Sequence, residues 1–403
     1  MKPLPRCIPT ALRIFSLGFL ILPNALLAQS ASELTLKDVL TTTLSHVIEP
    51  SEADETSPYQ ASSWLADLPS LSLSYLGSDQ RDGVDESEVS INLPVKSARR
   101  RSADSALQAL SIGLDDAGLQ LRSLYYSGLI REALWSFRLA DTKRQFASEK
   151  RRLLLELLRR QQELLAAGSS AEYTMLLLQM EIVQVEVEQH DVLQEARYWL
   201  ERYTSLTGLR TMPADIAEPF IPLSGGFRAD QHPQLQALDL AYQQRQQLLR
   251  ASSPQASDWN LALKAKHLDG AGYNEQQYGL GVEIPLSVFS VSRQSEDSDW
   301  RSVRREYQLT RDQFLADFSS SWERLSSERE SLQHKQVLLN RSRQLAGQIN
   351  EQLTQLHDSN EVAQEIVLRR MMAAIDTRAE YALNELLIGQ NNAMLRQTAG
   401  ISL

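Results

Sequence analysis

Two long stretches without proline, residues 97–167 and 296–356, limit what this chain can fold into more than any other feature. At 1.5 Å per residue, continuous helices over these stretches would be roughly 90 to 105 Å long. That length exceeds the width of a compact domain. Each stretch is followed by a short polar loop and a second helical stretch, residues 171–206 and 361–397. We therefore predict two long helical hairpins.

Apolar residues recur at heptad-like spacings in both predicted hairpins, a pattern typical of coiled coils. The simplest interpretation is a seam between the two helices of one hairpin, within one chain. In the first hairpin the stripe consists of Tyr173, Leu176, Met180, Val183 and Val187, and in the second of Leu338, Leu345, Ile349, Leu353 and Leu356.

Four short segments alternate apolar and polar residues, which predicts strands at about 70–76, 88–94, 260–268 and 277–286. The remaining chain outside the linker is expected to be helical. Four strands alone form an open sheet whose edges need partners. Either the chain's own helices cover the apolar face, or several chains close a barrel whose apolar face meets lipid. The strict alternation favours the barrel, with these lipid-facing residues: Leu71, Leu73, Tyr75, Val89, Ile91, Leu93, Leu261, Leu263, Tyr278, Leu280, Val282 and Ile284.

An internal duplication is indicated by two landmarks that share one shift. Pro94 and Pro285 each close a predicted strand, 285 − 94 = 191 residues apart, and the same shift carries Gly168 onto Ser359. Residues 209–233 are rich in proline and glycine, which predicts a linker. The predicted organisation is a leader at 1–28, a first repeat at 29–208, the linker at 209–233 and a second repeat at 234–403.

The first 28 residues have the layout of a secretory signal peptide. Lys2, Arg6 and Arg13 precede an apolar run at 14–22, and small residues offer a cleavage site near Ala28. The alternative is a buried N-terminal helix of a cytosolic protein. Cleavage would remove Cys7, the only cysteine, and would leave a net charge of 38 − 51 = −13.

This composition excludes several classes of function. A chain without cysteine has no disulfides and no cysteine-based zinc site. The excess of acidic residues and the short basic runs argue against a nucleic-acid partner. The sequence has no phosphate-binding glycine loop, no nucleophile elbow and no His-Glu-x-x-His motif. We therefore predict no catalytic residues, no metal site, no cofactor and no enzymatic activity.

The order of these motifs resembles that of the TolC-type outer-membrane efflux proteins. The resemblance rests on Leu-Pro-Ser-Leu-Ser-Leu-Ser at 68–74, Leu93-Pro94, Ala167-Gly168-Ser169 and Ile284-Pro285-Leu286, and it extends from about residue 34 to 400. It implies a mainly α fold with a small β part. Four strands from each chain of a homotrimer would form a twelve-stranded transmembrane barrel in the outer membrane, and long antiparallel coiled-coil hairpins would form a tunnel through the periplasm.

The resemblance also implies a function as the passive exit duct of a tripartite efflux or type I secretion system. The partners would be outer-membrane lipid, a periplasmic adaptor and an inner-membrane transporter. The adaptor is expected at the hairpin tips, which comprise Ala167, Gly168, Ser169, Ser170, Ser359 and Asn360. Acidic candidates for a periplasmic aperture are Asp358, Glu361 and Glu365, although Asp358 or Ser359 could instead cap a helix. The acidity of the chain predicts a cation-preferring pore.

The sequence departs from that family in two places. The second tip has no glycine like Gly168, so we expect Asn360 to take the left-handed position there and adaptor docking to differ. Residues 50–58 are acidic and prone to turns, so we expect the first helix to be short or broken. Two other functions stay open: a periplasmic coiled-coil structural or adaptor protein with a covered sheet, and the same duct dedicated to heavy-metal cations. A duct need not bind its cargo, so the residues leave the cargo open.

Overall fold

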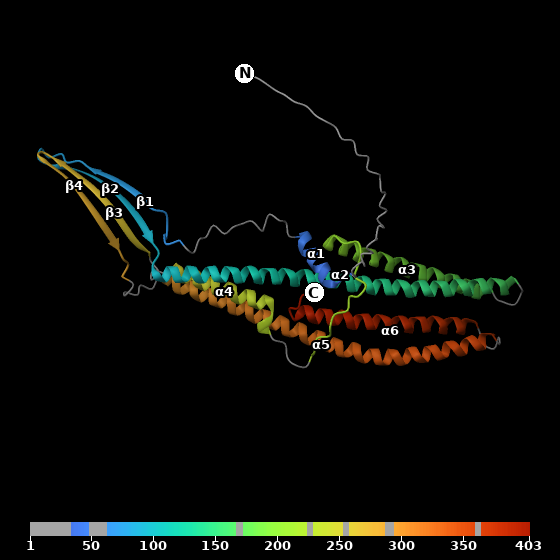
Figure 1. Ribbon diagram of the computed structural model, residues 1–403. Helices are drawn as coiled ribbons and strands as arrows, with labels where there is room; N and C mark the ends of the chain where they lie inside the picture. The colour runs from blue at the N-terminus through green and yellow to red at the C-terminus, as the bar shows by residue number, and fades with distance from the viewer. Residues whose placement is uncertain are drawn as a thin grey trace, which may run out of the picture.

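The computed structural model describes residues 34–47, 63–166, 172–223, 229–252, 258–286, 294–358 and 364–403, so the predicted leader at 1–28 lies outside it. The elements follow one order twice: a helix, two strands and two long helices (Figure 1). This order confirms the internal repeat. The first copy consists of α1 (Leu36–Val47), β1 (Ser70–Leu76), β2 (Val84–Val95), α2 (Ala98–Ala166) and α3 (Glu172–Thr207). The second consists of α4 (Pro233–Ala251), β3 (Trp259–Gly270), β4 (Tyr273–Glu283), α5 (Gln294–Asp358) and α6 (Gln364–Thr398).

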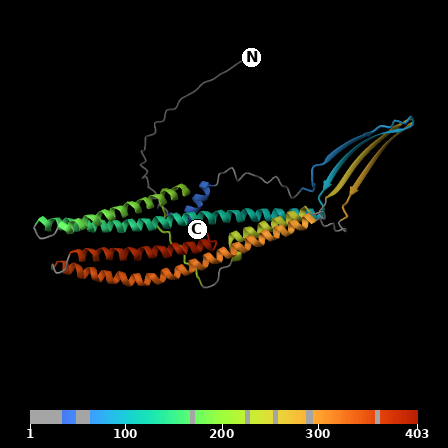
Figure 2. The ribbon, with the colours of Figure 1, turned by 180° about the vertical axis from the view of Figure 1, so that it is seen from behind.

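The long helices lie side by side and form an elongated body. In the half distant from the sheet the order across the body is α3, α2, α6, α5, and both views agree on it (Figures 1 and 2). In the half near the sheet, α4 lies between α2 and α5. With 69 residues, α2 is about 100 Å long. Within the described ranges, no helix combines the length and the apolar character needed to cross a membrane.

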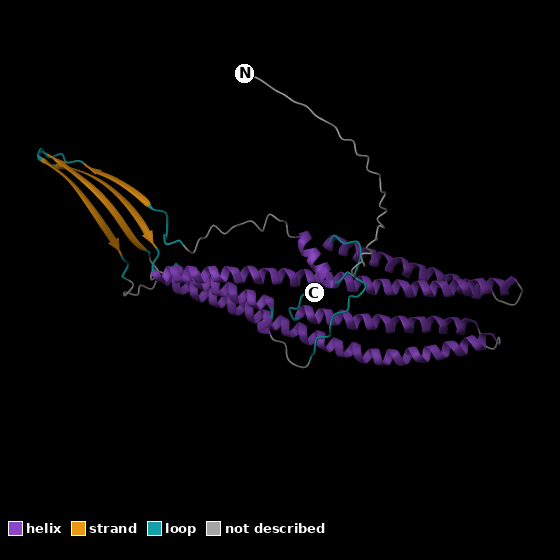
Figure 3. Ribbon diagram, in the orientation of Figure 1, coloured by secondary structure: helices purple, strands orange, loops and turns teal. Residues whose placement is uncertain are grey.

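The four strands form one antiparallel sheet in the order β1-β2-β3-β4. The pairing of β2 with β3 joins the two repeats and runs from Val84, opposite Gly270, to Val95, opposite Trp259. Because this ladder is continuous, β2 begins at Val84 and not near 88 as the sequence indicates. The sheet extends beyond one end of the helices, and none of the described helices lies over either face (Figure 3).

A buried ion pair ties the sheet to the helices. Lys96, directly after β2, lies 2.8 Å from a carboxylate oxygen of Asp104 in the second turn of α2, and both side chains are buried. Removing one partner of such a pair would leave a buried charge uncompensated. The ion pair therefore fixes the end of β2 relative to the start of α2.

The apolar core lies at the middle of the molecule, where α1, α2, α3, the linker and α6 meet. Its buried members are Val39, Leu40, Ile130, Ala133, Leu134, Trp135, Tyr203, Ile216 and Ala393. Gly389 in α6 faces the Trp135 ring, and a Cβ atom there would clash with that ring. The absence of a side chain at Gly389 thus lets α6 pack closely on α2.

The linker crosses this core as a strap, which we define as residues 213–221. Arg131 of α2 is only 1% exposed and donates to both carboxylate oxygens of Glu218, at 2.8 and 2.6 Å. Arg396 of α6 donates to the same carboxylate at 2.9 Å. Arg329 of α5 donates to the carbonyl oxygen of Ile221 at 2.7 Å. The strap therefore holds three helices from both repeats.

The predicted seam inside the first hairpin is wrong. Tyr173 is 65% exposed, and the other members of that stripe, Leu176, Met180, Val183 and Val187, are exposed as well. The side chains that pack against Leu154 of α2 are Leu178, Ile182 and Val185. Helix α3 carries two apolar stripes with similar spacing. The stripe that meets α2 contains Leu178, Ile182 and Val185 and is not the predicted one.

The same correction applies to the second hairpin. Leu338, Leu345 and Ile349 are exposed, whereas Leu325 and Leu339 of the same helix are buried. The side chains of Leu353 and Leu356 lie outside the described residues. Both outer helices, α3 and α5, therefore present apolar surface away from their hairpin partners.

Helix α4 begins with a histidine cap. His232 is buried, its Nδ1 accepts the backbone N–H of Gln234 at 3.1 Å, and its ring lies 5.0 Å from that of Phe314. Burial lowers the pKa of His232 below its ordinary value of 6.5. Protonation would remove the accepting lone pair and place a positive charge at a helix N-terminus.

We expect the folded state to lose stability as the pH falls below 6.5, through the lowered pKa of His232, because the unfolded chain binds this proton first. H232N keeps a capping oxygen that does not titrate. The melting temperature of the wild type should fall relative to that of H232N between pH 7 and pH 5. Parallel pH profiles for the two proteins would contradict this role.

Candidate functional site

The sheet has one apolar and one polar face, set by the register of its strands. Directly opposed residues share a face, and the pairs that oppose Leu73 to Val89, Ile91 to Leu263 and Leu263 to Leu280 gather the apolar residues on one side. Leu280 is 83% exposed. The predicted residues that lie on this face are Leu71, Leu73, Tyr75, Val89, Ile91, Leu93, Leu261, Leu263, Tyr278, Leu280 and Val282, while Ile284 follows the last residue of β4 and is exposed.

Aromatic side chains bound this apolar face. Trp259 pairs with Val95 at the end near the helices, and Tyr75 pairs with Ser87 toward the far end. The partners of these two aromatic residues on β2, Ser87 and Val95, are eight residues apart, which corresponds to about 26 Å along the strand. Transmembrane barrels have an outward apolar band about 25 Å tall between aromatic girdles. The face therefore has the dimensions and borders of a surface in contact with lipid.

The opposite face is polar. Its β2 and β3 residues include Glu88, Ser90, Asn92 and Lys264. Lys266 lies 2.6 Å from Glu86 and Lys264 lies 3.6 Å from Glu88. These charged side chains are partly exposed, which indicates that this face is in contact with water. Exposed pairs of this kind add little stability.

Both ends of the sheet order are open. Among the described strands, β1 pairs only with β2, and β4 only with β3. Unpaired backbone groups at an edge cannot be tolerated in lipid, where no water satisfies them. A sheet of this kind needs further strands along both edges wherever its apolar face meets lipid.

The helical body has matching open edges. The exposed apolar stripe of α3 lies at one edge and the stripe of α5 at the other, because α2 and α6 occupy the middle (Figure 2). One chain is thus a slab with two unpartnered sides in its helical half as well as in its sheet. The first repeat supplies β1 and α3, and the second supplies β4 and α5.

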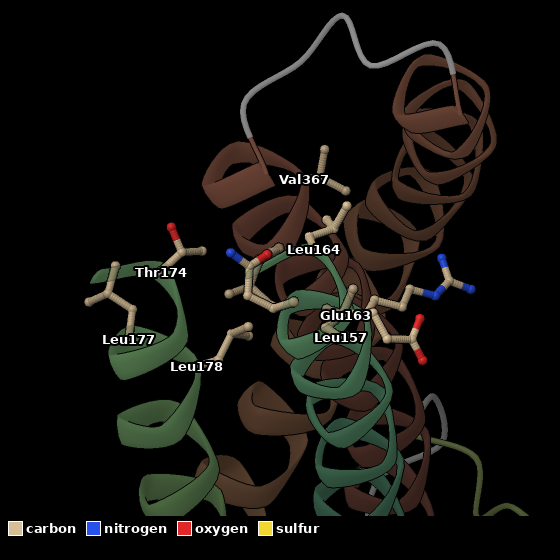
Figure 4. Close-up of a pocket in the computed structure, with 10 residues that line it drawn as sticks. Leu157, Glu163, Leu164, Thr174, Leu177, Leu178 and Val367 are labelled. Carbon is tan, nitrogen blue, oxygen red and sulfur yellow. The ribbon is translucent and has the colours of Figure 1, made fainter. Parts of the chain in front are cut away.

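An apolar groove opens near the hairpin tips. A cavity of about 340 Å³ lies between α2, α3 and α6. Leu157 and Leu164 from α2, Leu177 and Leu178 from α3, and Val367 from α6 surround it (Figure 4).

The predicted tip and aperture residues are not placed by the structure. Those outside the described residues are Ala167, Gly168, Ser169, Ser170, Ser359, Asn360 and Glu361. Asp358 is the last residue of α5 and Glu365 lies in the first turn of α6, but their side chains are not described. Within the described ranges, no three His, Cys, Asp or Glu residues are arranged to hold a metal ion.

The sequence did not reveal the strap cluster. Arg131 and Glu218 are 87 residues apart, and Glu218 and Arg396 are 178 apart. Only the linker's proline content marked this segment as irregular. No local pattern connects an arginine in a long helix with a glutamate in a linker.

Solved structures share this fold. The outer membrane protein VceC from Vibrio cholerae has a TM-score of 0.63 and 15% identity, covering 91% of this chain and 96% of that one. The outer-membrane channel OprN has a TM-score of 0.61 and 13% identity, with 91% and 89% covered. CusC has a TM-score of 0.60 and 14% identity, with 83% and 84% covered. No family model matches the sequence, and no curated protein matches it.

These similarities establish the fold. The chain has the fold of outer-membrane channel proteins, with long helical hairpins and a four-stranded sheet, as the resemblance to the TolC-type proteins predicts.

Adjacent residues of β1 test the assignment of the two faces. Ser72 and Leu73 are both exposed in the single chain but lie on opposite faces. We expect L73K to lower the stability of protein folded into lipid vesicles by about 1 to 2 kcal/mol, because Leu73 pairs with Val89, halfway between the aromatic border at Ser87 and the middle of the apolar band at Ile91, whereas S72K is tolerated. Urea titration of both variants in vesicles measures this difference. Equal effects would show that the apolar face does not meet lipid.

Proposed function

We propose that this protein is the outer-membrane exit duct of a tripartite efflux or type I secretion system, and that it conducts passively and is not an enzyme. The sheet would lie in the outer membrane, and the helices would extend through the periplasm. The observation that carries the proposal is the sheet that no described helix covers. One face is apolar and suited to contact with lipid, the other is polar and suited to contact with water, and the sheet lies at the end of helices about 100 Å long.

We infer that three copies close the duct. Four strands per chain would give twelve in a trimer, and the polar face of each sheet would line the lumen. In a cyclic assembly, the side formed by β1 and α3 of one copy meets the side formed by β4 and α5 of the next. The exposed stripes of α3 and α5 support this arrangement, because the same contact that pairs the strand edges would bury both.

The partners follow from the two ends of the molecule. Lipid would surround the sheet. A periplasmic adaptor would dock at the hairpin tips, comprising Ala167, Gly168, Ser169, Ser170, Ser359 and Asn360, and would connect the duct to an inner-membrane transporter. The groove of Figure 4 supports this site, since it places apolar surface at the end of α2 and at the starts of α3 and α6, which adjoin those residues in the chain.

The alternative of a soluble periplasmic coiled-coil protein requires a covered sheet. None of the described helices provides that cover. Fractionation separates the two functions, because a duct is recovered with outer membranes and a coiled-coil protein with the soluble periplasm.

The decisive experiment combines extraction with conductance. We expect detergent to extract the protein from the outer-membrane fraction as a particle of three chains, and planar bilayers that receive it to conduct ions. L73K should reduce the number of channels that insert without changing the conductance of each. Release with the periplasm, or a pure trimer that never conducts, would refute the proposed function.

The aperture is a second testable part of the proposal. Asp358, Glu361 and Glu365 would concentrate negative charge three-fold at the periplasmic end and would make the pore prefer cations. D358N/E361Q/E365Q should weaken that preference, measured as the reversal potential in a salt gradient. D79N, in the loop between β1 and β2 at the other end of the molecule, is the control and should leave it unchanged. Identical reversal potentials in the wild type and the triple variant would exclude these residues from the aperture.

A further inference from the structure

Side-chain amides of α6 bind backbone carbonyl oxygens in three neighbouring elements. Asn392 donates to the carbonyl oxygens of Glu218 and Pro219 in the strap, at 3.1 and 3.2 Å. Gln397 donates to that of Leu124 in α2 at 2.8 Å. Two further amides, those of Asn384 and Asn391, bind α5. The bonds of Asn392 and Gln397 reach the strap and α2, outside the α5–α6 hairpin, so a shift of α6 along its axis would break them.

Asn384 and Asn391 connect α6 to α5. Asn384 is 1% exposed and donates to the carbonyl oxygen of Leu332 at 2.9 Å. Asn391, also buried, donates to that of Leu325 at 3.1 Å. The two asparagines are seven residues apart, and so are the two acceptors, so both pairs occupy equivalent positions of an antiparallel heptad repeat.

The buried amides of these two asparagines are only half satisfied. The Oδ1 atoms of Asn384 and Asn391 are buried and have no hydrogen-bond partner among the described residues. A buried polar atom without a partner is costly, and an apolar side chain of similar size would avoid that cost. Asn384 also donates to the side-chain Oε1 of Gln336 at 2.7 Å, and a shift of one heptad would replace Gln336 by Arg329 or Arg343, which have no acceptor. Buried asparagines with side-chain partners specify register in coiled coils in this way.

Register determines which residues form the tip of a hairpin. If α6 moved by one heptad along α5, the turn between the two antiparallel helices would move by about half that distance, three to four residues. Different side chains would then occupy the tip. An apolar stripe with a seven-residue repeat does not prevent such a shift, because it superimposes on itself.

We propose that Asn384, Asn391, Asn392 and Gln397 are positioning residues that fix the axial register of α6 and thereby the residues that form the tip of the second hairpin. The first hairpin is joined by pairs between side chains, such as Arg151 with Glu186 and Gln189 with Ser148. The positioning role does not depend on conduction, so it can fail or hold independently of the proposed duct.

Disulfide trapping tests the register directly in the full chain. Leu339 and Thr377 lie one heptad toward the tip from Leu332 and Asn384, so L339C/T377C reports the observed register. L332C/T377C and A346C/T377C report shifts of one heptad in either direction. Such a shift is about 10 Å, beyond the reach of a disulfide from the observed register.

In the otherwise wild-type chain we expect only L339C/T377C to cross-link. Adding N384L/N391L should raise the yield of at least one shifted disulfide about tenfold, and adding Q397L should raise it further. Helix content, measured by circular dichroism, should stay the same. Q333L, which removes an exposed amide from α5, is the matched control and should not change the pattern.

An unchanged cross-linking pattern through the whole series would overturn the proposal. Loss of helix content without shifted disulfides in N384L/N391L would also overturn it, since that result assigns the amides to stability alone. If N384L/N391L/Q397L does not fold, the single variants N384L and N391L, tested with the same cysteine pairs, decide the outcome.

Discussion

The structure depends on a four-stranded sheet whose two faces and two outer edges are left open by the part of the chain that the structure describes. Backbone groups at the outer edges of β1 and β4 need partners, and the apolar face needs a surrounding without water. A globular protein would meet both needs with a helix, but the described helices run away from the sheet (Figure 3). The proposed closure by further copies in a membrane would satisfy both needs together, because the same assembly would pair the edges and turn the apolar face outward.

The helical half also has surfaces that lack a partner among the described residues, but these surfaces consist of apolar side chains and not of backbone groups. A slab of parallel and antiparallel helices has no large core, so its apolar surface is divided between seams inside the chain and stripes left for neighbours. The molecule compensates at its middle, where Arg131, Glu218 and Arg396 form a buried charged cluster and Gly389 admits the Trp135 ring. Specificity there comes from hydrogen bonds with defined partners, which apolar stripes cannot supply.

The misassigned seam shows where sequence analysis reaches its limit. Residues 173, 176, 180, 183 and 187 have the spacing of a coiled-coil seam, and so do Leu178, Ile182 and Val185. Both stripes exist, and periodicity gives the direction of each around the helix without saying what lies opposite. The assignment of one to α2 and the other to the exposed side follows from the placement of α2 between α3 and α6.

The sequence by itself determined the local features of this protein: strands with unlike faces, helices of tunnel length, an internal repeat and an irregular linker. The strands, the helices and the linker follow from residue types at short spacings, which act through backbone preference and periodicity, and the repeat follows from landmarks that share one shift of 191 residues. Only the tertiary structure decided which stripe is buried, how the strap is held and which carbonyl oxygens the α6 amides bind. The hydrogen bonds that hold the strap and those from the α6 amides to carbonyl oxygens join residues 52 to 273 positions apart, and a hydrogen bond between such groups depends on the arrangement of whole helices, which no local pattern encodes.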